Sequence, residues 1–161
     1  MTDKKPATTA AQALQWSPQQ SSALLQVKQW LATPKKQRKQ VFHLFGYAGT
    51  GKTTLAKEIA GMAKGEVLFM CFTGKASLVL RKKGCAGAST IHSAIYKAKR
   101  DPRTGKHTFK RNPDSAVATA ALVIVDEVSM VNGTLGQDLV SFGTPILMLP
   151  YTCTLTPLET T

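Results

Sequence analysis

The segment from Gly46 to Thr53 reads GYAGTGKT and fits the pattern G-x-x-x-x-G-K-[ST]. In this pattern glycines let successive backbone N–H groups curl around phosphate oxygens, the N-terminus of the next helix adds positive partial charge, and a lysine reaches the terminal phosphates. An ordinary glycine-rich turn is the alternative, although such a turn rarely lies between an apolar run and a helix-forming segment. The pattern therefore predicts that the chain binds a nucleoside triphosphate.

Each part of the loop has a predicted role. We expect Lys52 to hold the β- and γ-phosphates and the Thr53 hydroxyl to ligate Mg²⁺, while the glycines let the backbone approach the phosphates. The residues expected to bind the nucleotide from this loop are Gly46, Gly49, Thr50, Gly51, Lys52, Thr53 and Thr54. The predicted ligands are a nucleoside triphosphate and Mg²⁺.

A second group with chemical potential is the acidic pair Asp126 and Glu127, which follows the apolar run 122–125. Mg²⁺ needs a second anchor on a strand next to the loop strand, and we expect Asp126 to supply it. Glu127 is then placed to polarise the water that attacks the γ-phosphate. The alternative is an acidic pair that only ends a strand and caps the next helix.

Gln20 has two interpretations, and its position leaves both open. As the third residue after Ser17 it completes a capping box at a helix start. As a side-chain amide ahead of the phosphate loop, it could hydrogen-bond adenine as donor and acceptor and so select ATP.

The elements that must position these residues alternate between helix and strand. Expected helices cover 17–33, 52–64, 74–83, 91–98 and a weaker segment containing Gly133 and Gly136. Expected strands cover 41–45, 67–72, 122–125 and 145–149, with a hairpin folding around the turn residues 101–105. This alternation predicts an α/β fold, with a parallel β-sheet flanked by helices and right-handed crossovers.

Length and composition narrow the class of protein. The 161 residues suffice for one domain, preceded by a polar, flexible arm over residues 1–15. The net charge of +12 favours a polyanionic partner such as nucleic acid. The three widely spaced cysteines and the three histidines indicate no disulfide framework and no structural metal, so a reducing, cytoplasmic setting is expected. No segment has the pattern of a signal peptide or a membrane span.

Several polar and basic residues are candidates for contact with nucleic acid. Thr73, Lys75, Thr90 and His92 follow strands or begin helices, where their donors could hold phosphates, although caps and turns use the same residue types. The segment 97–111 is strongly basic, with Tyr96 and Phe109 as possible base-stacking surfaces. A solvated run of charge is the commoner explanation for such a segment.

Five motifs together resemble the ordered motifs of RecD-like, superfamily-one DNA helicases. These motifs are Trp16–Gln20, Gly46–Thr54, Thr73–Ser77, Ser89–His92 and Asp126–Met130. The resemblance covers residues 16–149 and implies a RecA-like P-loop NTPase domain. It also implies that Gln20 reads adenine, that Lys52 and Thr53 bind MgATP, and that Glu127 activates water.

Further expectations come from the same resemblance. Thr73, Lys75, Thr90 and His92 would lie along a path for single-stranded DNA. The family moves along DNA, generally 5′ to 3′, and closes ATP between two RecA-like domains. Replication or recombination proteins are its possible partners, and the sequence identifies none of them.

The resemblance ends at Leu149, where the family pattern continues as G-D-x-x-Q-L-P-P. Here the chain instead runs from Pro150 to Thr161 without that motif, which suggests an ATPase domain incomplete at the C-terminus and a non-family tail over 150–161. Three functions therefore compete: a DNA-dependent ATPase domain of a helicase, a domain that holds ATP and single-stranded DNA without turnover, and, more distantly, a phosphate-loop ATPase of another DNA-processing type such as a nuclease subunit.

Overall fold

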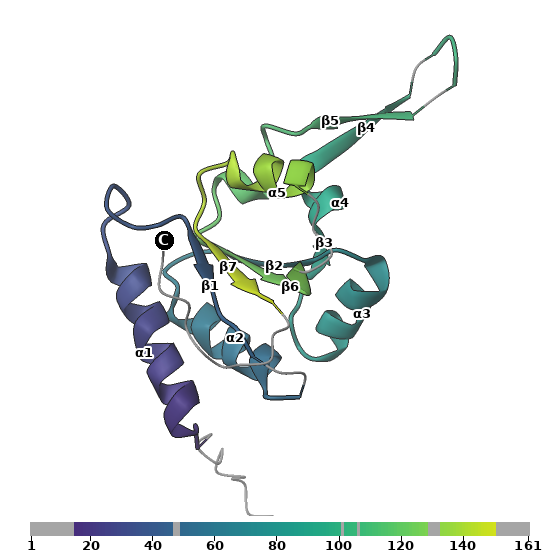
Figure 1. The fold of residues 1–161 in the computed structure, drawn as a ribbon. Coiled ribbons are helices and arrows are strands. Elements are labelled where there is room, and N and C mark those ends of the chain that lie inside the picture. The colour runs from purple at the N-terminus through teal and green to yellow at the C-terminus, as the bar shows by residue number, and fades with distance from the viewer. Residues whose placement is uncertain (1–14, 47–48, 101, 106, 129–132, 151–161) are drawn as a thin grey trace, which may run out of the picture.

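The computed structural model describes residues 15–46, 49–100, 102–105, 107–128 and 133–150 (Figure 1). Its helices are α1 (Pro18–Ala32), α2 (Lys52–Met62), α3 (Gly74–Lys82), α4 (Ile91–Ile95), the 3-10 turn η1 (Ala116–Ala118) and α5 (Gly133–Val140). Its strands are β1 (Val41–His43), β2 (Val67–Cys71), β3 (Ser89–Thr90), β4 (Tyr96–Arg100), β5 (His107–Arg111), β6 (Leu122–Asp126) and β7 (Ile146–Leu149). The predicted arm, apart from residue 15, and the predicted tail, apart from residue 150, lie outside these ranges.

Five strands form one sheet in the order β1-β7-β6-β2-β3, and each pairing is parallel. The predicted parallel α/β fold is therefore confirmed. One expectation is wrong, because the acidic pair does not follow a strand adjacent to β1. Strand β7 lies between β1 and β6 and pairs with both, through Ile146 opposite Val41 on one side and Val123 on the other.

Both faces of this sheet are covered, which explains why its strands are continuous apolar runs. Side chains alternate along β6, so Leu122 and Ile124 pack with α1 and α2, whereas Val123 and Val125 pack with α4 and α5. Figure 1 shows α1 and α2 on one side of the sheet and α4 and α5 on the other. The two apolar cores hold the carboxyl ends of β1, β2 and β6 in fixed relation, and the candidate residues follow those ends.

The predicted start of α1 is confirmed in detail. Ser17 is the N-cap, Pro18 is the first helical residue, and Gln20 completes a capping box with Ser17. The helix ends before Pro34, as expected, but its third buried residue is Trp30, because Leu31 is only partly buried. The indole N–H of Trp30 donates to the carbonyl of Lys39 at 2.6 Å.

The predicted helix over 91–98 is too long. Helix α4 ends at Ile95, because the chain from Tyr96 onward pairs in antiparallel fashion with His107–Arg111. The predicted hairpin therefore begins five residues earlier than its turn signals, and β4 and β5 project away from the sheet (Figure 1). Within the described residues, no helix is both long and apolar enough to cross a membrane.

Candidate functional site

The phosphate loop leads from the end of β1 into α2. Gly49 and Gly51 both have left-handed backbones, with φ of 80° and 79°, and they flank Thr50. Such φ values strain residues that carry a Cβ atom, so both positions favour glycine. Gly51 is the N-cap of α2 and provides no side-chain cap, which leaves backbone N–H groups to face the site. Tyr47 and Ala48 lie outside the described residues.

Lys52 is held inside this loop rather than extended into solvent. Its side chain is 9% exposed, and its ammonium group donates a hydrogen bond to the carbonyl of Gly46. Burial lowers the pKa of Lys52, and the negative charge of Asp126 opposes that shift. Its ammonium group is thus partly desolvated and lies within electrostatic range of Asp126.

The acidic pair lies at the end of β6. Asp126 is in register with Cys71 of β2 and Leu149 of β7, and one of its carboxylate oxygens accepts the backbone N–H of Glu127 at 3.0 Å. Burial raises the pKa of Asp126, while that hydrogen bond and the charge of Lys52 act in the opposite direction. Glu127 has φ of 56°, the one positive φ among the described non-glycine residues. Such a conformation is strained and is characteristic of functional sites.

The loop and the acidic pair meet in one cavity of about 640 Å³. This volume falls within the range of small-molecule sites. The predicted site residues that line it are Gly49, Gly51, Lys52, Thr53, Thr54, Thr73, Lys75, Asp126 and Glu127. Residues separated by more than 70 positions in the sequence therefore surround the same space, because parallel strands deliver their carboxyl ends to one edge of the sheet.

The cavity has a wall that the sequence did not predict. Helix α3 contributes Ala76, Val79 and Leu80, the middle of α2 contributes Lys57, and the C-cap of α3 contributes Lys83. The ammonium group of Lys57 donates to the carbonyl of Lys83 at 3.0 Å, so it joins the two helices beside the cavity. No local motif identifies these residues, since their place depends on how α3 packs against the edge of the sheet.

Five other predicted residues do not line the cavity: Gln20, Gly46, Thr50, Thr90 and His92. Gln20 contacts the phosphate loop from behind, through a hydrogen bond from its side-chain amide to the carbonyl of Thr50 at 3.1 Å. Gly46 and Thr50 contact other predicted site residues through their backbone carbonyl groups. The Gly46 carbonyl accepts a hydrogen bond from Lys52, and the Thr50 carbonyl accepts one from Gln20.

The residues predicted to contact nucleic acid lie at the N-termini of α3 and α4. Thr73 and Thr90 are the N-caps of these helices, and their hydroxyl groups accept the N–H groups of Ala76 at 3.2 Å and Ser93 at 3.1 Å. Their capping role is thus present in the structure, and a role with nucleic acid remains a prediction. Lys75 is exposed at the start of α3.

His92 connects α4 to the β4–β5 hairpin through ring contacts. Its ring centroid lies 4.7 Å from that of Tyr96 and 4.6 Å from that of Phe109. Phe109 is 56% exposed despite its size. The three rings form an aromatic cluster at the base of the hairpin, beside basic residues on both strands.

The hairpin has two chemically different faces. Cross-strand pairing places Tyr96 opposite Arg111 and Ala98 opposite Phe109 on one face. The other face carries Lys97 opposite Lys110 and Lys99 opposite Thr108. One face is therefore aromatic with guanidinium groups, and the other is a lysine face.

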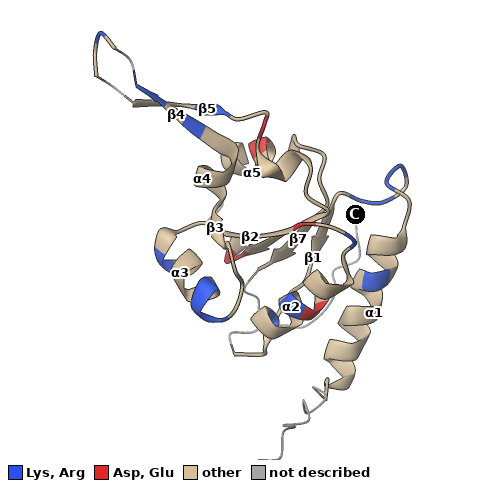
Figure 2. Cartoon of the chain, turned by 180° about the vertical axis from the view of Figure 1, so that it is seen from behind, with Lys and Arg blue, Asp and Glu red and all other residues tan. Residues whose placement is uncertain are grey.

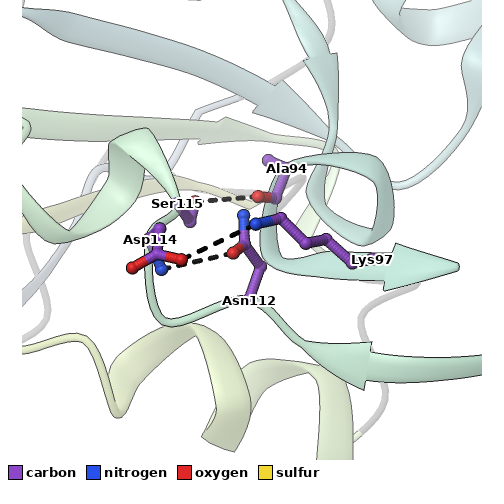
Figure 3. A network of polar contacts seen from close by, with 5 residues as sticks. All are labelled: Ala94, Lys97, Asn112, Asp114 and Ser115. Atoms are coloured by element: carbon purple, nitrogen blue, oxygen red, sulfur yellow. Dashed lines mark hydrogen bonds and ion pairs between the residues drawn. The ribbon is translucent and has the colours of Figure 1, made fainter. Parts of the chain in front are cut away.

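Polar contacts attach the hairpin to the rest of the domain at its base. The Tyr96 hydroxyl bonds to Asp138 of α5, and Arg111 bonds to Ser141 just after α5. Figure 3 shows a second set of contacts, in which Lys97 pairs with Asp114 at 3.6 Å and Ser115 donates to the carbonyl of Ala94 at 2.7 Å. The lysine–aspartate pair is exposed and contributes little stability.

Basic residues are spread over several surfaces. Figure 2 shows Lys and Arg along the hairpin, on α3 and in the loop after α1. The hairpin is the longest of these surfaces, and β5 is exposed throughout.

A parallel sheet with a phosphate loop after β1 and an acidic pair after β6 places the chain in the P-loop class of α/β domains. Residues 29–145 match the family model described as an AAA domain, and the chain belongs to this family. No curated protein matches the sequence significantly.

Solved structures with the same fold include Pif1 helicases. A structure of two coordinating Pif1 helicases that unwind forked double-stranded DNA superposes with a TM-score of 0.59 at 17% identity, covering 92% of this chain and 36% of that chain. Pif1 helicase from Bacteroides, in complex with ADP-AlF3 and ssDNA, superposes with a TM-score of 0.58 at 20% identity, covering 92% and 35%. The fold is therefore RecA-like, as predicted, and the chain spans about a third of the length of these structures.

Proposed function

We propose that this chain is the ATP-binding and ATP-hydrolysing motor domain of a 5′–3′ DNA helicase of the RecD-like group, acting on single-stranded DNA. The observation that carries the proposal is the shared cavity, which joins Lys52 and Thr53 of the phosphate loop to Asp126 and Glu127. A purely structural capping role for the acidic pair would not require it to face the loop.

The chemistry follows from the positions of these side chains. Backbone N–H groups of the loop and the α2 N-terminus bind phosphate oxygens, while Lys52 exchanges the Gly46 carbonyl for a terminal phosphate. Glu127 then accepts a proton from the water that attacks the γ-phosphate. The bond between the γ-phosphorus and the oxygen bridging the β- and γ-phosphates breaks, and ADP leaves with that oxygen. Neutralising the phosphate charge in a partly desolvated site lowers the barrier of this step.

The donor set also fits Mg²⁺. Thr53 offers a hydroxyl oxygen and Asp126 a carboxylate oxygen, and both residues line the cavity. These are hard oxygen ligands, which Mg²⁺ prefers. When bound, the ion would supply positive charge to the β- and γ-phosphates.

Single-stranded DNA is the proposed polymer ligand. Thr73 and Lys75 line the cavity, and His92 begins the aromatic cluster that continues onto the hairpin, so these residues outline a route from the ATP site to the basic surface. Thr90 caps the same helix that carries His92. Pif1 helicase from Bacteroides was crystallised with ssDNA, which supports the same ligand here. We assign the protein to the cytoplasm, in DNA replication, recombination or repair.

The test is steady-state ATP hydrolysis by the purified chain, with and without single-stranded DNA, and with Glu127→Gln as the blank. We expect DNA-stimulated turnover that Glu127→Gln lowers by about 10²- to 10⁴-fold, the range of a general base. Equilibrium binding of MgATP should change less than threefold, which separates chemistry from binding.

The second candidate is a domain that binds ATP and single-stranded DNA without turnover. Hydrolysis equal to that of Glu127→Gln, together with measurable ATP binding that Lys52→Ala removes, would select this second candidate.

A further inference from the structure

Gln20 lies where α1 meets the phosphate loop, and both ends of its side-chain amide are engaged by protein. Its carbonyl oxygen accepts the backbone N–H of Ser17 at 2.9 Å, and its amide nitrogen donates to the carbonyl of Thr50 at 3.1 Å. The contact with Thr50 spans thirty residues of sequence and is partly buried. Gln20 itself does not line the cavity.

The contact falls on a peptide unit that has glycine on its C-terminal side, the unit between Thr50 and Gly51. Thr50 is flanked by Gly49 and Gly51, both with left-handed φ. Glycine crosses between backbone regions at low cost, so the peptide unit between Thr50 and Gly51 can turn about its flanking bonds unless something holds it. The side-chain amide of Gln20 supplies such a hold, because it donates a hydrogen bond to the Thr50 carbonyl.

Holding this carbonyl also orients an N–H group. In a planar trans peptide the C=O of one residue and the N–H of the next point in opposite directions. A Thr50 carbonyl directed at Gln20, outside the cavity, therefore directs the Gly51 N–H away from Gln20. Gly51 lines the cavity and is the N-cap of α2, so its N–H belongs to the group that would receive phosphate oxygens.

We propose that Gln20 is a positioning residue, which fixes the Thr50–Gly51 peptide so that the Gly51 N–H is presented to phosphate. This role concerns the phosphates and not the base, so it applies equally to any nucleoside triphosphate. The proposal rests on the proposed nucleotide site.

The capping box and the contact with the loop can be separated by mutation. Gln20→Met keeps the length of the side chain and removes both the donor to Thr50 and the oxygen that accepts the Ser17 N–H, so it breaks the loop contact and one of the two bonds of the capping box. Ser17→Ala removes the hydroxyl group that accepts the Gln20 N–H at 3.2 Å, but it leaves the bond between Gln20 and Thr50. Gln26→Met makes the same chemical change on the same helix, where the amide contacts only the Ser22 hydroxyl in the recorded bonds.

The first measurement is the affinity of each variant for MgATP, MgGTP and inorganic tripolyphosphate. We expect Gln20→Met to weaken all three by the same factor, roughly tenfold, which corresponds to one hydrogen bond to a charged group. Ser17→Ala and Gln26→Met should stay within about twofold of the unmodified chain. Loss of ATP affinity with GTP and tripolyphosphate unchanged would overturn the proposal and make Gln20 an adenine reader, and so would affinities unchanged for all three ligands.

The second measurement needs no ligand. We expect the amide resonance of Gly51 in a ¹H–¹⁵N spectrum to shift or broaden in Gln20→Met and to stay in place in Ser17→Ala. An unmoved Gly51 resonance in a folded Gln20→Met variant would overturn the proposal, even if the unmodified chain bound none of the three ligands. If the unmodified chain bound none of the three ligands while the Gly51 resonance moved as expected, the result would instead contradict the proposed nucleotide site.

Discussion

The cavity and the β4–β5 hairpin present opposite ways of arranging charge. In the cavity, Lys52 is 9% exposed and Asp126 follows four buried residues of β6, so the fold fixes both charges and shifts their pKa values. On the hairpin, every residue of β5 and all of β4 after Tyr96 are exposed. Charges in the cavity should therefore act at short range and resist salt, whereas those of the hairpin should act together and be screened by salt.

The largest expected effect concerns the cavity. Lys52→Ala should weaken MgATP binding by about two orders of magnitude, because it removes charge-assisted hydrogen bonds to phosphate in a desolvated site. The factor should change little between low and moderate salt. Isothermal titration calorimetry measures this, with the exposed Lys64→Ala as the matched control. A loss of MgATP affinity below fivefold, or one that disappears at moderate salt, would show that the charge of Lys52 is screened like the charges of the hairpin. The proposed difference between the cavity and the hairpin would then be wrong.

The next effect concerns the lysine face of the hairpin. Lys99 and Lys110 lie on this face, and Lys97 is left in place because it pairs with Asp114. Changing both Lys99 and Lys110 to Gln should weaken binding of a single-stranded oligonucleotide by about tenfold at low salt. The slope of log K against log salt should fall by about 1.4, which is 0.7 for each of two phosphate contacts. Fluorescence anisotropy over a salt series measures both quantities.

The control for this pair is Lys35→Gln with Lys36→Gln, in the exposed loop after α1. This control variant also removes two positive charges, but at positions that are distant from the hairpin in the sequence. Equal losses from the two double variants would show that DNA affinity follows net charge alone, so the hairpin would have no special role.

A smaller effect is expected on the aromatic face. Phe109→Ala should weaken oligonucleotide binding by about fivefold, because it removes one stacking surface, and it should leave the salt slope unchanged. The same anisotropy series therefore distinguishes the two faces of one hairpin. A changed slope with Phe109→Ala would show that the faces do not act separately. MgATP affinity serves as the internal control and should not move.

The same contrast explains how far the sequence could predict the structure. The phosphate loop, the acidic pair and the hairpin turn are local patterns. Each consists of residues that are close together in the sequence, so the sequence alone was enough to locate them. The place of β7 between β1 and β6 was missed, because strand order is set by pairing between segments about a hundred residues apart.

Two features of the site were missed for a similar reason. The wall formed by Val79 and Lys83 depends on the packing of α3, and the bond from Gln20 to Thr50 depends on how α1 meets the loop. Neither leaves a local signal in the sequence. The predicted strand 41–45 extends past the real end of β1 at His43, since the chain turns into the phosphate loop there although its residues remain apolar.

The smallest expected effect is on the free energy of unfolding. It tests whether burying the Asp126 carboxylate in the cavity destabilises the folded state. The pKa of Asp126 is raised by burial, so the folded state binds its proton more readily than the unfolded state. As pH rises from the ordinary aspartate value through the raised one, the free energy of unfolding therefore falls. Asp126→Asn, which carries no charge, should be more stable than the unmodified chain at neutral pH, and the difference should shrink as pH falls through the raised pKa of Asp126 toward about 4.

Thermal unfolding of the nucleotide-free chain at several pH values measures this difference, with Asp114→Asn as the exposed control. The stabilised Asp126→Asn variant should at the same time lose MgATP hydrolysis, because it lacks the carboxylate proposed to hold the ion. A buried charge kept at the expense of stability is expected where function requires it. If Asp126→Asn were instead less stable at neutral pH, the attraction between Asp126 and Lys52 would outweigh the cost of burying the carboxylate. Asp126 and Lys52 would then form a stabilising ion pair, and the presence of these two charges in the cavity would need no functional explanation.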